Sequence, residues 1–332
     1  MIESYKNPEQ ITSPDKFEED VLDEQSLRPS RFDDFIGQHE TVENLKVYIK
    51  AAIQRDEALD HVLLFGPPGL GKTTLAKIIS NEMSSGLKSA VGPSMIKIEL
   101  ATILTNLAEG DVFFIDEIHR MQPQIQETLY PAMEDYKLDL PVGQGPSADI
   151  IPVPLSRFTL IGATTREGLL AAPFRDRFGI RIHLDYYTVE ELKIAILRNS
   201  EKMNVEVDDE AQLEIGLRSR GTMRIAKNLL FNVRDYASVK YDGVVTKDVA
   251  LEALSFFQID ELGLDEQDRD YLRALIDKFD GRAGLKSLAV AISEDERTVE
   301  EVYEPYLIKI GFISFTPTGR VATDRAYNHL GY

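Results

Sequence analysis

Hydrophobic residues follow two spacings along this chain, and the changes of spacing mark its folding units. Apolar runs at 61–65, 111–115 and 158–163 show no polar alternation, which is typical of parallel strands buried on both faces. Elsewhere apolar residues recur every three or four positions, which predicts amphipathic helices. The first such helix precedes the first strand and carries Val42, Leu45, Tyr48, Ile49, Ala52 and Ile53. Strands that alternate with helices predict an α/β domain with a parallel sheet, here over residues 27–186.

One segment inside this domain has a different strand pattern. Leu138, Leu140 and Val142 alternate with other residues, as do Ile151, Val153 and Leu155, and the glycine-containing stretch 143–147 lies between the two sets. This pattern predicts a β-hairpin over about 138–155. Three prolines in it remove backbone donors, so the strands belong at an edge or project from the domain. Such a hairpin either packs on the core or forms an interaction site, and its residues leave both open.

Two further units follow the α/β domain. From about 189 to 254 the periodicity is only helical, which predicts a small α-helical domain over 187–257. After an acidic stretch at 260–268, three helical patterns around 272–279, 285–292 and 299–307 precede two short strands at 312–316 and 320–323. Three helices and a ribbon predict a winged helix over 258–332, a fold that usually contacts nucleic acid. Its acidic first helices leave a protein-docking winged helix as the alternative.

Composition excludes several classes of protein. With 332 residues, of which 43% are hydrophobic, the chain can bury more than one core. It has no Cys, which excludes disulfides and Cys-based zinc sites, and its five His lack metal-ligand spacing. No signal peptide precedes the first domain, and no apolar run approaches the about 18 residues of a membrane span. We therefore expect a soluble, cytoplasmic protein without membrane contact.

The formal charge of −19 argues against a polyanionic partner, but the charge is unevenly distributed. Residues 1–26 contain eight acidic and two basic side chains without periodicity, which predicts a disordered acidic tail. Residues 305–332 contain three basic side chains and one acidic side chain. A basic edge on the last domain is therefore compatible with the acidic whole.

The most specific motif of the chain joins the first apolar run to a helix-forming run. Residues 66–74 read GPPGLGKTT, which has the phosphate-binding spacing G-x-x-x-x-G-K-S/T. Gly69 and Gly71 let backbone N–H groups converge on a polyphosphate at a helix N-terminus. Lys72 would reach the β- and γ-phosphates, and Thr73 would hold Mg²⁺. An ordinary strand-turn-helix with incidental glycines does not require this spacing, so we predict ATP binding.

Hydrolysis also needs side chains that support the metal and polarise the attacking water. Such side chains follow the other two predicted buried strands. The run at 111–115 ends in Asp116 and Glu117, so Asp116 can support the magnesium shell while Glu117 polarises the attacking water. Two acids after a strand can also simply cap a helix, but their position after a phosphate-binding loop favours catalysis. The run at 158–163 leads into Thr164 and Thr165, whose hydroxyls can sense a γ-phosphate or orient water.

Three arginines complete the candidate chemistry. Arg175 and Arg177 lie in a short segment bounded by Pro173 and Gly179, which on its own is typical of a solvated loop. In a phosphate-binding ATPase such a loop can place a guanidinium against the γ-phosphate of a neighbouring subunit. Arg224 lies in the first turn of a predicted helix, where the helix dipole disfavours a cation unless an anion such as ATP compensates.

Together these motifs resemble the RuvB family of AAA+ ATPases, which are Holliday-junction branch-migration motors. The resemblance extends from Leu27 to Gly331 and rests on segments 66–74, 116–120, 130–136, 162–166, 175–179, 220–224 and 302–308. It implies an AAA+ core with a parallel sheet, a small all-α lid and a C-terminal winged helix. Clamp-loader and initiator ATPases share the core, and a nucleotide-dependent scaffold is the alternative from another class.

The resemblance also implies roles for individual residues. Asp116 and Glu117 would be catalytic, Thr165 or less favourably Thr164 would be sensor 1, and Arg177 or less favourably Arg175 would be the arginine finger acting in trans. Arg224 would be sensor 2. The remaining contacts to ATP would come from Leu27, Arg28, Gly69, Gly71, Lys72, Thr73, Thr74, Tyr187 and the backbone of Glu134, Asp135 and Tyr136.

The implied partners are DNA and two other proteins. The hairpin would dock the junction-binding protein RuvA, the resolvase RuvC would join the full assembly, and the chain would form a homo-hexameric ring on duplex DNA during homologous recombination, DNA repair and the SOS response to DNA damage. Phe315 and Thr318 stand where the family typically has wing arginines, which leaves Arg320 as the matching DNA contact and Phe315 as a weak one. Met223 replaces the usual Pro.

Overall fold

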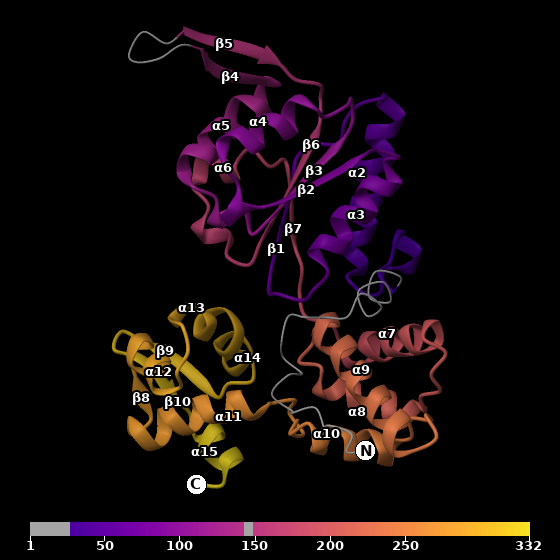
Figure 1. Cartoon of the computed structure of the whole chain (residues 1–332), viewed down its shortest axis with the longest axis vertical. Helices are drawn as coiled ribbons and strands as arrows, with labels where there is room; N and C mark the ends of the chain where they lie inside the picture. The colour runs from indigo at the N-terminus through magenta and orange to yellow at the C-terminus, as the bar shows by residue number, and fades with distance from the viewer. Residues whose placement is uncertain (1–26, 143–148) are drawn as a thin grey trace, which may run out of the picture.

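The computed structural model describes residues 27–142 and 149–332. The predicted acidic tail and the turn of the predicted hairpin at 143–148 lie outside these residues. An α/β domain occupies the upper half of Figure 1, and a helical domain and a smaller domain of helices and strands lie below it. None of the described helices is long and apolar enough to cross a membrane. The α/β core, the helical lid and the winged helix confirm the predicted fold class.

A five-stranded parallel sheet forms the centre of the α/β domain. Its strand order is β2-β3-β6-β1-β7, with Val62 of β1 opposite Ile161 on one side and Ile180 on the other. The long apolar runs form the three central strands, which are almost entirely buried. The strands are β1 (Val62–Phe65), β2 (Leu87–Val91), β3 (Val112–Asp116), β6 (Thr159–Thr164) and β7 (Ile180–His183).

Helices cover both faces of this sheet, so neighbouring residues of one strand face different cores. Val62 and Leu64 pack with α2 and α3, whereas Leu63 packs with α4 and α5. Figure 1 shows these two helix layers on opposite sides of the strands. The helices and short helical turns are η2 (Phe32–Asp34), α2 (His39–Arg55), α3 (Lys72–Glu82), η3 (Gly92–Ser94), α4 (Lys97–Thr105), η4 (Ile118–Arg120), α5 (Pro123–Glu134), η5 (Glu167–Leu169) and α6 (Ala172–Arg175).

The helix predicted before the first strand forms, but its buried face is narrower than its apolar spacing indicates. Leu45, Ile49 and Ala52 are buried, whereas Tyr48 and Ile53 are 48% and 53% exposed. Tyr48 lies one position before the buried Ile49, and Ile53 lies one position after the buried Ala52. One position is about 100° around a helix. They therefore contribute little to the core.

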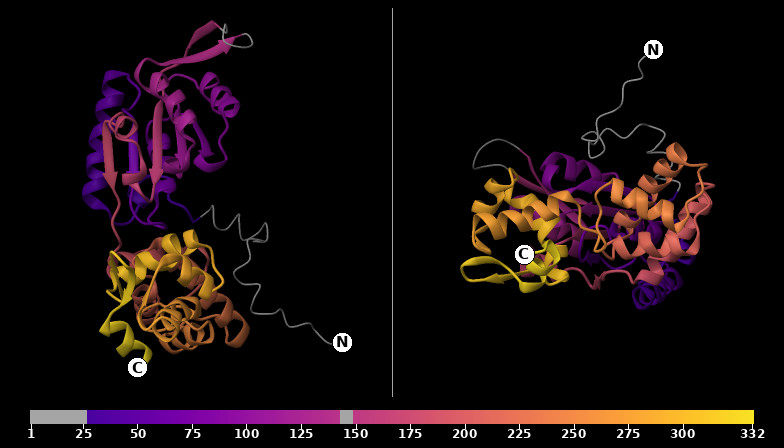
Figure 2. Two further views of the ribbon diagram at one scale, coloured as in Figure 1. Left: turned by 90° about the vertical axis from the view of Figure 1, so that its left-hand side faces the viewer. Right: turned by 90° about the horizontal axis from the view of Figure 1, so that it is seen from below.

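The hairpin forms a two-stranded sheet of its own, away from the central sheet. Strands β4 (Lys137–Val142) and β5 (Asp149–Pro154) pair antiparallel, with Leu138 opposite Val153. The hairpin projects from the end of the α/β domain that is remote from the two smaller domains (Figures 1 and 2). Leu138 at its base is buried, whereas Ile151 is 49% exposed. Leu138 thus anchors the base of the hairpin in the core.

The lid is a bundle of helices whose starts are fixed by side-chain caps. Thr188, Asp208, Thr222 and Thr246 each accept a hydrogen bond from a backbone N–H in the first turn of the following helix, which satisfies a donor that the helix leaves open. The helices are α7 (Val189–Lys202), α8 (Asp209–Arg218), α9 (Met223–Lys240) and α10 (Lys247–Phe256). Their apolar faces share a core cluster with α2 and α3 of the α/β domain.

The last domain has a separate core and is a winged helix. Its three-stranded sheet has the order β8-β10-β9. The sequence pattern predicts neither the two-residue strand β8 nor the final helix α15, because both are too short to show periodicity. The elements are α11 (Glu266–Arg273), η6 (Ala274–Lys278), β8 (Arg282–Ala283), α12 (Leu285–Ala291), α13 (Glu296–Thr298), η7 (Val299–Tyr303), α14 (Glu304–Lys309), β9 (Ile313–Thr316), β10 (Gly319–Ala322) and α15 (Asp324–Leu330).

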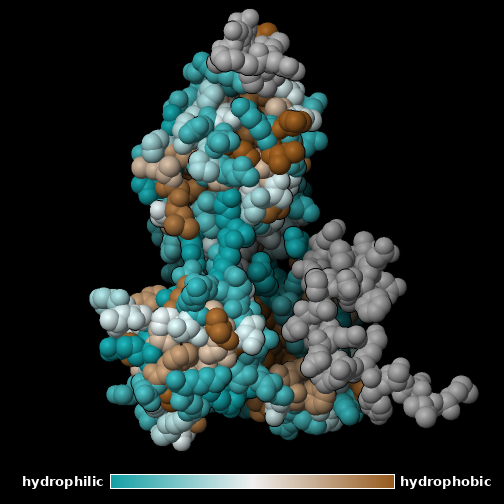
Figure 3. Space-filling model, turned by 60° about the vertical axis from the view of Figure 1, so that its left-hand side comes forward, coloured by the Kyte–Doolittle hydropathy of each residue, from teal (hydrophilic) through white to brown (hydrophobic). Residues whose placement is uncertain are grey.

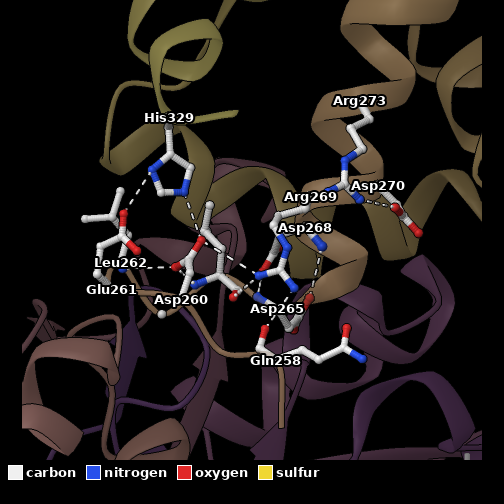
Figure 4. Close-up of polar contacts among 12 residues, drawn as sticks. Gln258, Asp260, Glu261, Leu262, Asp265, Asp268, Arg269, Asp270, Arg273 and His329 are labelled. Atoms are coloured by element: carbon white, nitrogen blue, oxygen red, sulfur yellow. Dashed lines mark hydrogen bonds and ion pairs between the residues drawn. The ribbon is translucent and has the colours of Figure 1, made fainter. Parts of the chain in front are cut away.

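The connection between the lid and the winged helix is held by polar contacts. On the face shown in Figure 3, hydrophilic residues also occupy the waist between the α/β domain and the two smaller domains. Asp260 accepts hydrogen bonds from the backbone N–H of Leu262 and Leu264, and His329 of α15 lies 2.9 Å from its carboxylate (Figure 4). Arg269 donates to the backbone carbonyls of Gln258 and Leu264. The linker is therefore clamped rather than free.

A buried ion pair joins the two small domains. Arg220 of the lid pairs with Asp268 of α11, donates to the carbonyl of Gly263 at 2.7 Å and lies over the ring of Tyr306. The Asp268 side chain is fully buried. Burial raises the pKa of this carboxyl, and the adjacent guanidinium acts in the opposite direction. The Arg220 guanidinium therefore stabilises the charged form of the buried Asp268 carboxyl, and the carboxylate in turn stabilises the guanidinium.

We predict that Arg220→Gln destabilises the chain by about 3–5 kcal/mol, because it leaves the Asp268 carboxylate buried without its cation. Thermal unfolding measures the effect. The matched control is Arg273→Gln, which removes the partner of Asp270 from a pair whose side chains are 50% and 58% exposed, and should change stability by less than about 1 kcal/mol. Equal melting temperatures for Arg220→Gln and the parent chain would contradict the prediction.

Candidate active site

A cavity of about 380 Å³ lies between the α/β domain and the lid, at the carboxyl ends of the parallel strands. Open parallel sheets bind ligands at this end. The segment before α2, the phosphate-binding loop, the ends of β3 and β6, and lid helices α7 and α9 all contribute to its walls. Of the residues predicted for the site, the walls contain Leu27, Arg28, Gly69, Gly71, Lys72, Thr73, Thr74, Asp116, Glu117, Thr165, Tyr187 and Arg224.

Glycine is required at two positions of the phosphate-binding loop. Gly69 and Gly71 have φ values of +78° and +95°, in the left-handed region that glycine adopts without strain. A Cβ at Gly69 would also lie 3.0 Å from the Cβ of Arg224. Helix α3 begins immediately afterwards at Lys72, and no acidic side chain lies in its first turn. Its open N–H groups therefore face the cavity as an anion site.

Lys72 is a largely buried cation at this helix start. Its side chain extends along the loop, and Nζ donates to the carbonyls of Gly66 and Pro67, both at 2.8 Å. Burial lowers the pKa of Lys72 to about 8, and the nearby carboxylates of Asp116 and Glu117 only partly offset this. The charged ammonium is therefore under-compensated until an anion enters the cavity.

Thr73 and Asp116 are arranged to share a hard cation. The Thr73 hydroxyl lies 3.4 Å from Oδ2 of Asp116, whose Oδ1 accepts the backbone N–H of Glu117. Mg²⁺ is usually bound by one or two carboxylates together with substrate phosphates and water. Among the described residues there is no cluster of three His, Cys, Asp or Glu side chains that could hold a metal without such help. These oxygen donors fit a nucleotide-bound Mg²⁺.

Glu117 projects from the end of β3 with an unusual backbone conformation. Its φ of +51° lies in the left-handed region, which is uncommon for a non-glycine residue and frequent at functional sites. Burial, followed by the neighbouring carboxylate of Asp116, raises the pKa of Glu117. A carboxylate with raised basicity next to a phosphate site is suited to accept a proton from water.

The two candidate sensor threonines have different environments. Thr165 lines the cavity, and its buried hydroxyl has no hydrogen-bond partner within residues 27–142 and 149–332. The Thr164 hydroxyl lies 2.9 Å from Nδ1 of His119 and accepts the backbone N–H of Arg166. An unsatisfied hydroxyl at the cavity wall favours Thr165 as the group that contacts a phosphate or water.

Two lid residues connect the cavity to the phosphate-binding loop. The backbone N–H of Arg224 donates to the carbonyl of Gly69 at 3.3 Å, which places its side chain over the loop. Tyr187 donates its hydroxyl proton to the carbonyl of Leu70 at 2.9 Å, and its backbone N–H donates to the carbonyl of Gly221. A change at the phosphates therefore acts directly on the lid.

Glu134, Asp135 and Tyr136, predicted as nucleotide contacts, do not line the cavity of their own chain. Helix α5 begins near the carboxyl end of the sheet and runs back along it for about 18 Å, given its 12 residues. Its last residues therefore lie at the opposite end of the strands. Tyr136 packs there against Phe158 and His61, which precede β6 and β1.

The two candidate finger arginines also lie outside the cavity of their own chain. Arg177 lies over the ring of Tyr130 at 4.5 Å and pairs with Glu134 at 3.0 Å. Arg175 lies 3.9 Å from Asp176. Neither guanidinium lines the nucleotide site of its own chain, and Arg177 shares its surface with Glu134.

The winged helix approaches the ATPase domain through acidic residues of η7. Glu300 pairs with Arg166 of the α/β domain at 3.2 Å and with Arg320 of β10 at 3.4 Å, so one carboxylate bridges two domains. Glu301 contributes to the raised pKa of Glu117. The third helix of a winged helix often reads DNA, but here its acidic face lies toward the catalytic centre.

Arg320, predicted as a DNA contact, is turned inward in the structure. Its guanidinium donates to both carboxylate oxygens of Glu304, at 2.7 and 3.0 Å, and its side chain is only 13% exposed. Glu304 is itself buried and also accepts the hydroxyl proton of Tyr271. Phe315, which stacks on Arg320, is 57% exposed. This network holds the wing in place. It also engages the Arg320 guanidinium with Glu304.

We predict that Lys72→Met raises the stability of the nucleotide-free chain at pH 7 by about 1–3 kcal/mol while abolishing nucleotide binding. The pKa of Lys72 is lower in the folded state than the ordinary 10.5, so the buried charge costs stability below about pH 8. This cost disappears as the pH rises from about 8 to 10.5. Thermal unfolding of the Met variant, the parent and Lys72→Arg at pH 7 and pH 10 measures it.

The expected result is a gain for the Met variant that shrinks toward pH 10, with no gain for Lys72→Arg, which keeps the charge. A Met variant that is less stable than the parent at both pH values would show that the ammonium is stabilising.

Comparison with protein families gives matches along nearly the whole described chain. Residues 27–184 match the model of the Holliday junction DNA helicase RuvB P-loop domain. Residues 187–260 match the RuvB AAA lid domain, and residues 261–331 match the RuvB C-terminal winged helix domain. All three units that the structure contains are therefore accounted for by one family, in the same order.

Solved structures agree with this assignment. The Thermotoga maritima RuvB Holliday junction branch migration motor is 46% identical, covers 92% of this chain and 98% of its own length, and superposes with a TM-score of 0.84. A mutant form of Thermotoga maritima RuvB is 45% identical over 93% of this chain and 99% of its own, with a TM-score of 0.86. Because the cavity contains a complete phosphate-binding loop beside Asp116 and Glu117, and all three domains match, the chain belongs to the RuvB family.

Proposed function

We propose that this chain hydrolyses ATP to drive branch migration of Holliday junctions in homologous recombination and DNA repair. The observation that carries the proposal is the joining of one complete ATPase cavity to a lid and a winged helix of the RuvB type. A P-loop core alone would equally serve a clamp loader or an initiator ATPase. The junction-specific activity therefore follows from the whole chain rather than from the cavity.

The residues that line the cavity have separate roles in this proposal. Lys72 and the N-terminus of α3 bind the phosphates, and Arg224 approaches them from the lid. Mg²⁺, held by Thr73 and Asp116, would neutralise phosphate charge. Glu117 accepts a proton from the attacking water, and Thr165 orients that water or the γ-phosphate. Leu27, Arg28 and Tyr187 enclose the rest of the nucleotide.

In our proposal, a neighbouring subunit supplies one further cation to the nucleotide site, namely the arginine finger. Arg177 lies outside its own cavity and on an outer surface with Glu134, so it can stabilise a γ-phosphate only in trans. The Glu134 to Tyr136 segment would approach the neighbour's nucleotide together with it. A closed homo-hexameric ring around duplex DNA satisfies this requirement for every site, with Arg175 as the alternative finger.

Further partners belong to other surfaces. The projecting β4–β5 hairpin is separate from the catalytic centre and suits docking of RuvA, and RuvC would join the full assembly in the cytoplasm. On the winged helix, Arg282, Lys286 and Arg325 are exposed, whereas Arg320 is not. DNA phosphates would therefore meet these three side chains first.

The function is tested with the purified chain, RuvA and a synthetic four-way junction. We expect ATP hydrolysis to be stimulated by the junction, and ATP to be needed for conversion of the junction into two duplexes. Junction-independent hydrolysis would favour a clamp loader or initiator. Nucleotide binding or hydrolysis without branch movement would favour a scaffold.

We predict that Arg177→Ala and Lys72→Met are each inactive but regain ATP hydrolysis when mixed. In a mixed ring, a Lys72→Met subunit can supply its arginine to the intact nucleotide site of an Arg177→Ala neighbour. Steady-state hydrolysis across mixing ratios measures this recovery, which should peak near equal amounts. A mixture of Lys72→Met with Glu117→Gln is the control, because neither subunit then has a working site. If the first mixture co-assembles and stays inactive, the trans assignment is wrong.

We predict that Lys286 contributes to DNA binding, whereas Arg320 contributes to the stability of the wing. Lys286→Gln should lower the slope of log affinity against log salt by about one unit, with an unchanged melting temperature, because one phosphate contact is lost. Arg320→Gln should instead lower the melting temperature, since it leaves Glu304 buried without its cation. Fluorescence anisotropy at several salt concentrations and thermal unfolding measure the two effects. The reverse pattern would restore Arg320 as the DNA contact.

A further inference from the structure

His119 is a buried side chain whose two ring nitrogens face two parts of the catalytic centre. It lies in η4, directly after the catalytic carboxylates, and its side chain is 2% exposed. Nδ1 lies 2.9 Å from the hydroxyl of Thr164 on β6. Nε2 lies 3.6 Å from Oε2 of Glu117 and has no hydrogen-bond partner in the part of the chain that the structure describes.

The hydrogen-bond network assigns the proton on this ring. Burial lowers the pKa of His119, so the imidazole is neutral and carries one N–H. The Thr164 oxygen accepts the backbone N–H of Arg166, and within residues 27–142 and 149–332 its own proton has no acceptor other than Nδ1, so the hydroxyl donates to Nδ1. The remaining N–H is then on Nε2 and is directed at the carboxylate of Glu117.

A second buried histidine shows what a purely structural role looks like in this fold. Nδ1 of His61 accepts the backbone N–H of Leu160 at 2.9 Å, and its Nε2 lies 3.1 Å from the carbonyl of Met133. Both nitrogens are satisfied by backbone groups. His119 differs because one of its nitrogens is unpartnered and faces a catalytic side chain, although an unmade buried hydrogen bond is costly.

We propose that His119 is a positioning residue that holds the Glu117 carboxylate in its catalytic orientation and couples it to β6 through Thr164. This rests on the proposed role of Glu117 in hydrolysis. The 3.6 Å separation exceeds hydrogen-bond length, and a small rotation of the Glu117 side chain closes it. Catalytic hydrogen bonds often tighten only when substrate is bound.

The connection gives the catalytic carboxylate a link to the sensor. Thr165, with its free hydroxyl at the cavity wall, is adjacent in the chain to Thr164. A γ-phosphate that engages Thr165 moves the end of β6, and the Thr164 hydroxyl transmits that movement to the imidazole. Glu117 is then aligned when the γ-phosphate is present and released after it leaves.

The first experiment compares His119→Phe with His119→Gln. Phe keeps the ring and removes both nitrogens, whereas Gln places an amide N–H near the position of Nε2. We expect His119→Phe to lower kcat by about 10–100-fold, the usual cost of losing an orienting partner, with nucleotide Kd changed by less than about twofold. His119→Gln should recover most of the rate. Equal losses in both variants, or an unchanged rate in His119→Phe, would overturn the proposal.

The second experiment tests the link to β6, and its comparison of Val with Ser at position 164 does not depend on how well the ring variants fold. Thr164→Val removes the hydroxyl with little change of shape, and Thr164→Ser keeps it. We expect a lower kcat for Val alone, and a His119→Phe, Thr164→Val double variant no slower than His119→Phe. Additive losses, or equal rates for Val and Ser, would show that no coupling passes through this hydroxyl.

Glu117→Gln separates failure of this inference from failure of the proposed function. If Glu117→Gln hydrolyses ATP at the parent rate, the role of Glu117 itself is wrong. If Glu117→Gln is inactive while His119→Phe turns over normally, the ATPase mechanism stands and the positioning role falls. In single-turnover measurements of the residual activity, adding His119→Phe to Glu117→Gln should cause no further loss.

Discussion

A buried cation without a matching anion is the constraint on which the rest of this structure depends. Lys72 is desolvated at the start of α3, and the carboxylates around it do not restore its ordinary pKa. Arg224 approaches the same loop and adds a second positive charge to the cavity. The strands, the glycines and the lid can be understood as the scaffold that keeps Lys72 buried until a polyphosphate arrives. The charge of Lys72 therefore favours nucleotide binding but lowers the stability of the nucleotide-free chain.

The acidic character of the chain has a specific distribution around this centre. The winged helix directs Glu300 and Glu301 toward the α/β domain, where Glu300 meets Arg166 and Glu301 influences Glu117. The same Glu300 contacts Arg320 of the wing. A strongly negative total charge is therefore compatible with a DNA motor, because part of it is used between domains rather than displayed to DNA.

The sequence was sufficient for the features that depend on local spacing. Apolar runs located the central strands, the glycine pattern located the phosphate-binding loop, and alternation located the hairpin, all of which the structure contains. Local spacing did not show the surroundings of residues whose contacts lie far away in the chain. The 12-residue length of α5 carries Glu134 away from the cavity, and Arg320 is occupied by Glu304, 16 positions earlier.

His119 belongs to the same class of residue, since its position beside Glu117 was visible but its bond to Thr164, 45 residues away, was not. Movement in this molecule also follows from such distant pairs. In the proposed mechanism Arg224 would respond to the phosphates, and four residues before it Arg220 pairs with Asp268 of the winged helix. Because that pair is buried, a rotation of the lid at nucleotide release would carry the winged helix with it. The chemical step is thus coupled to the DNA-facing domain through charges that cannot separate cheaply, rather than through a flexible linker.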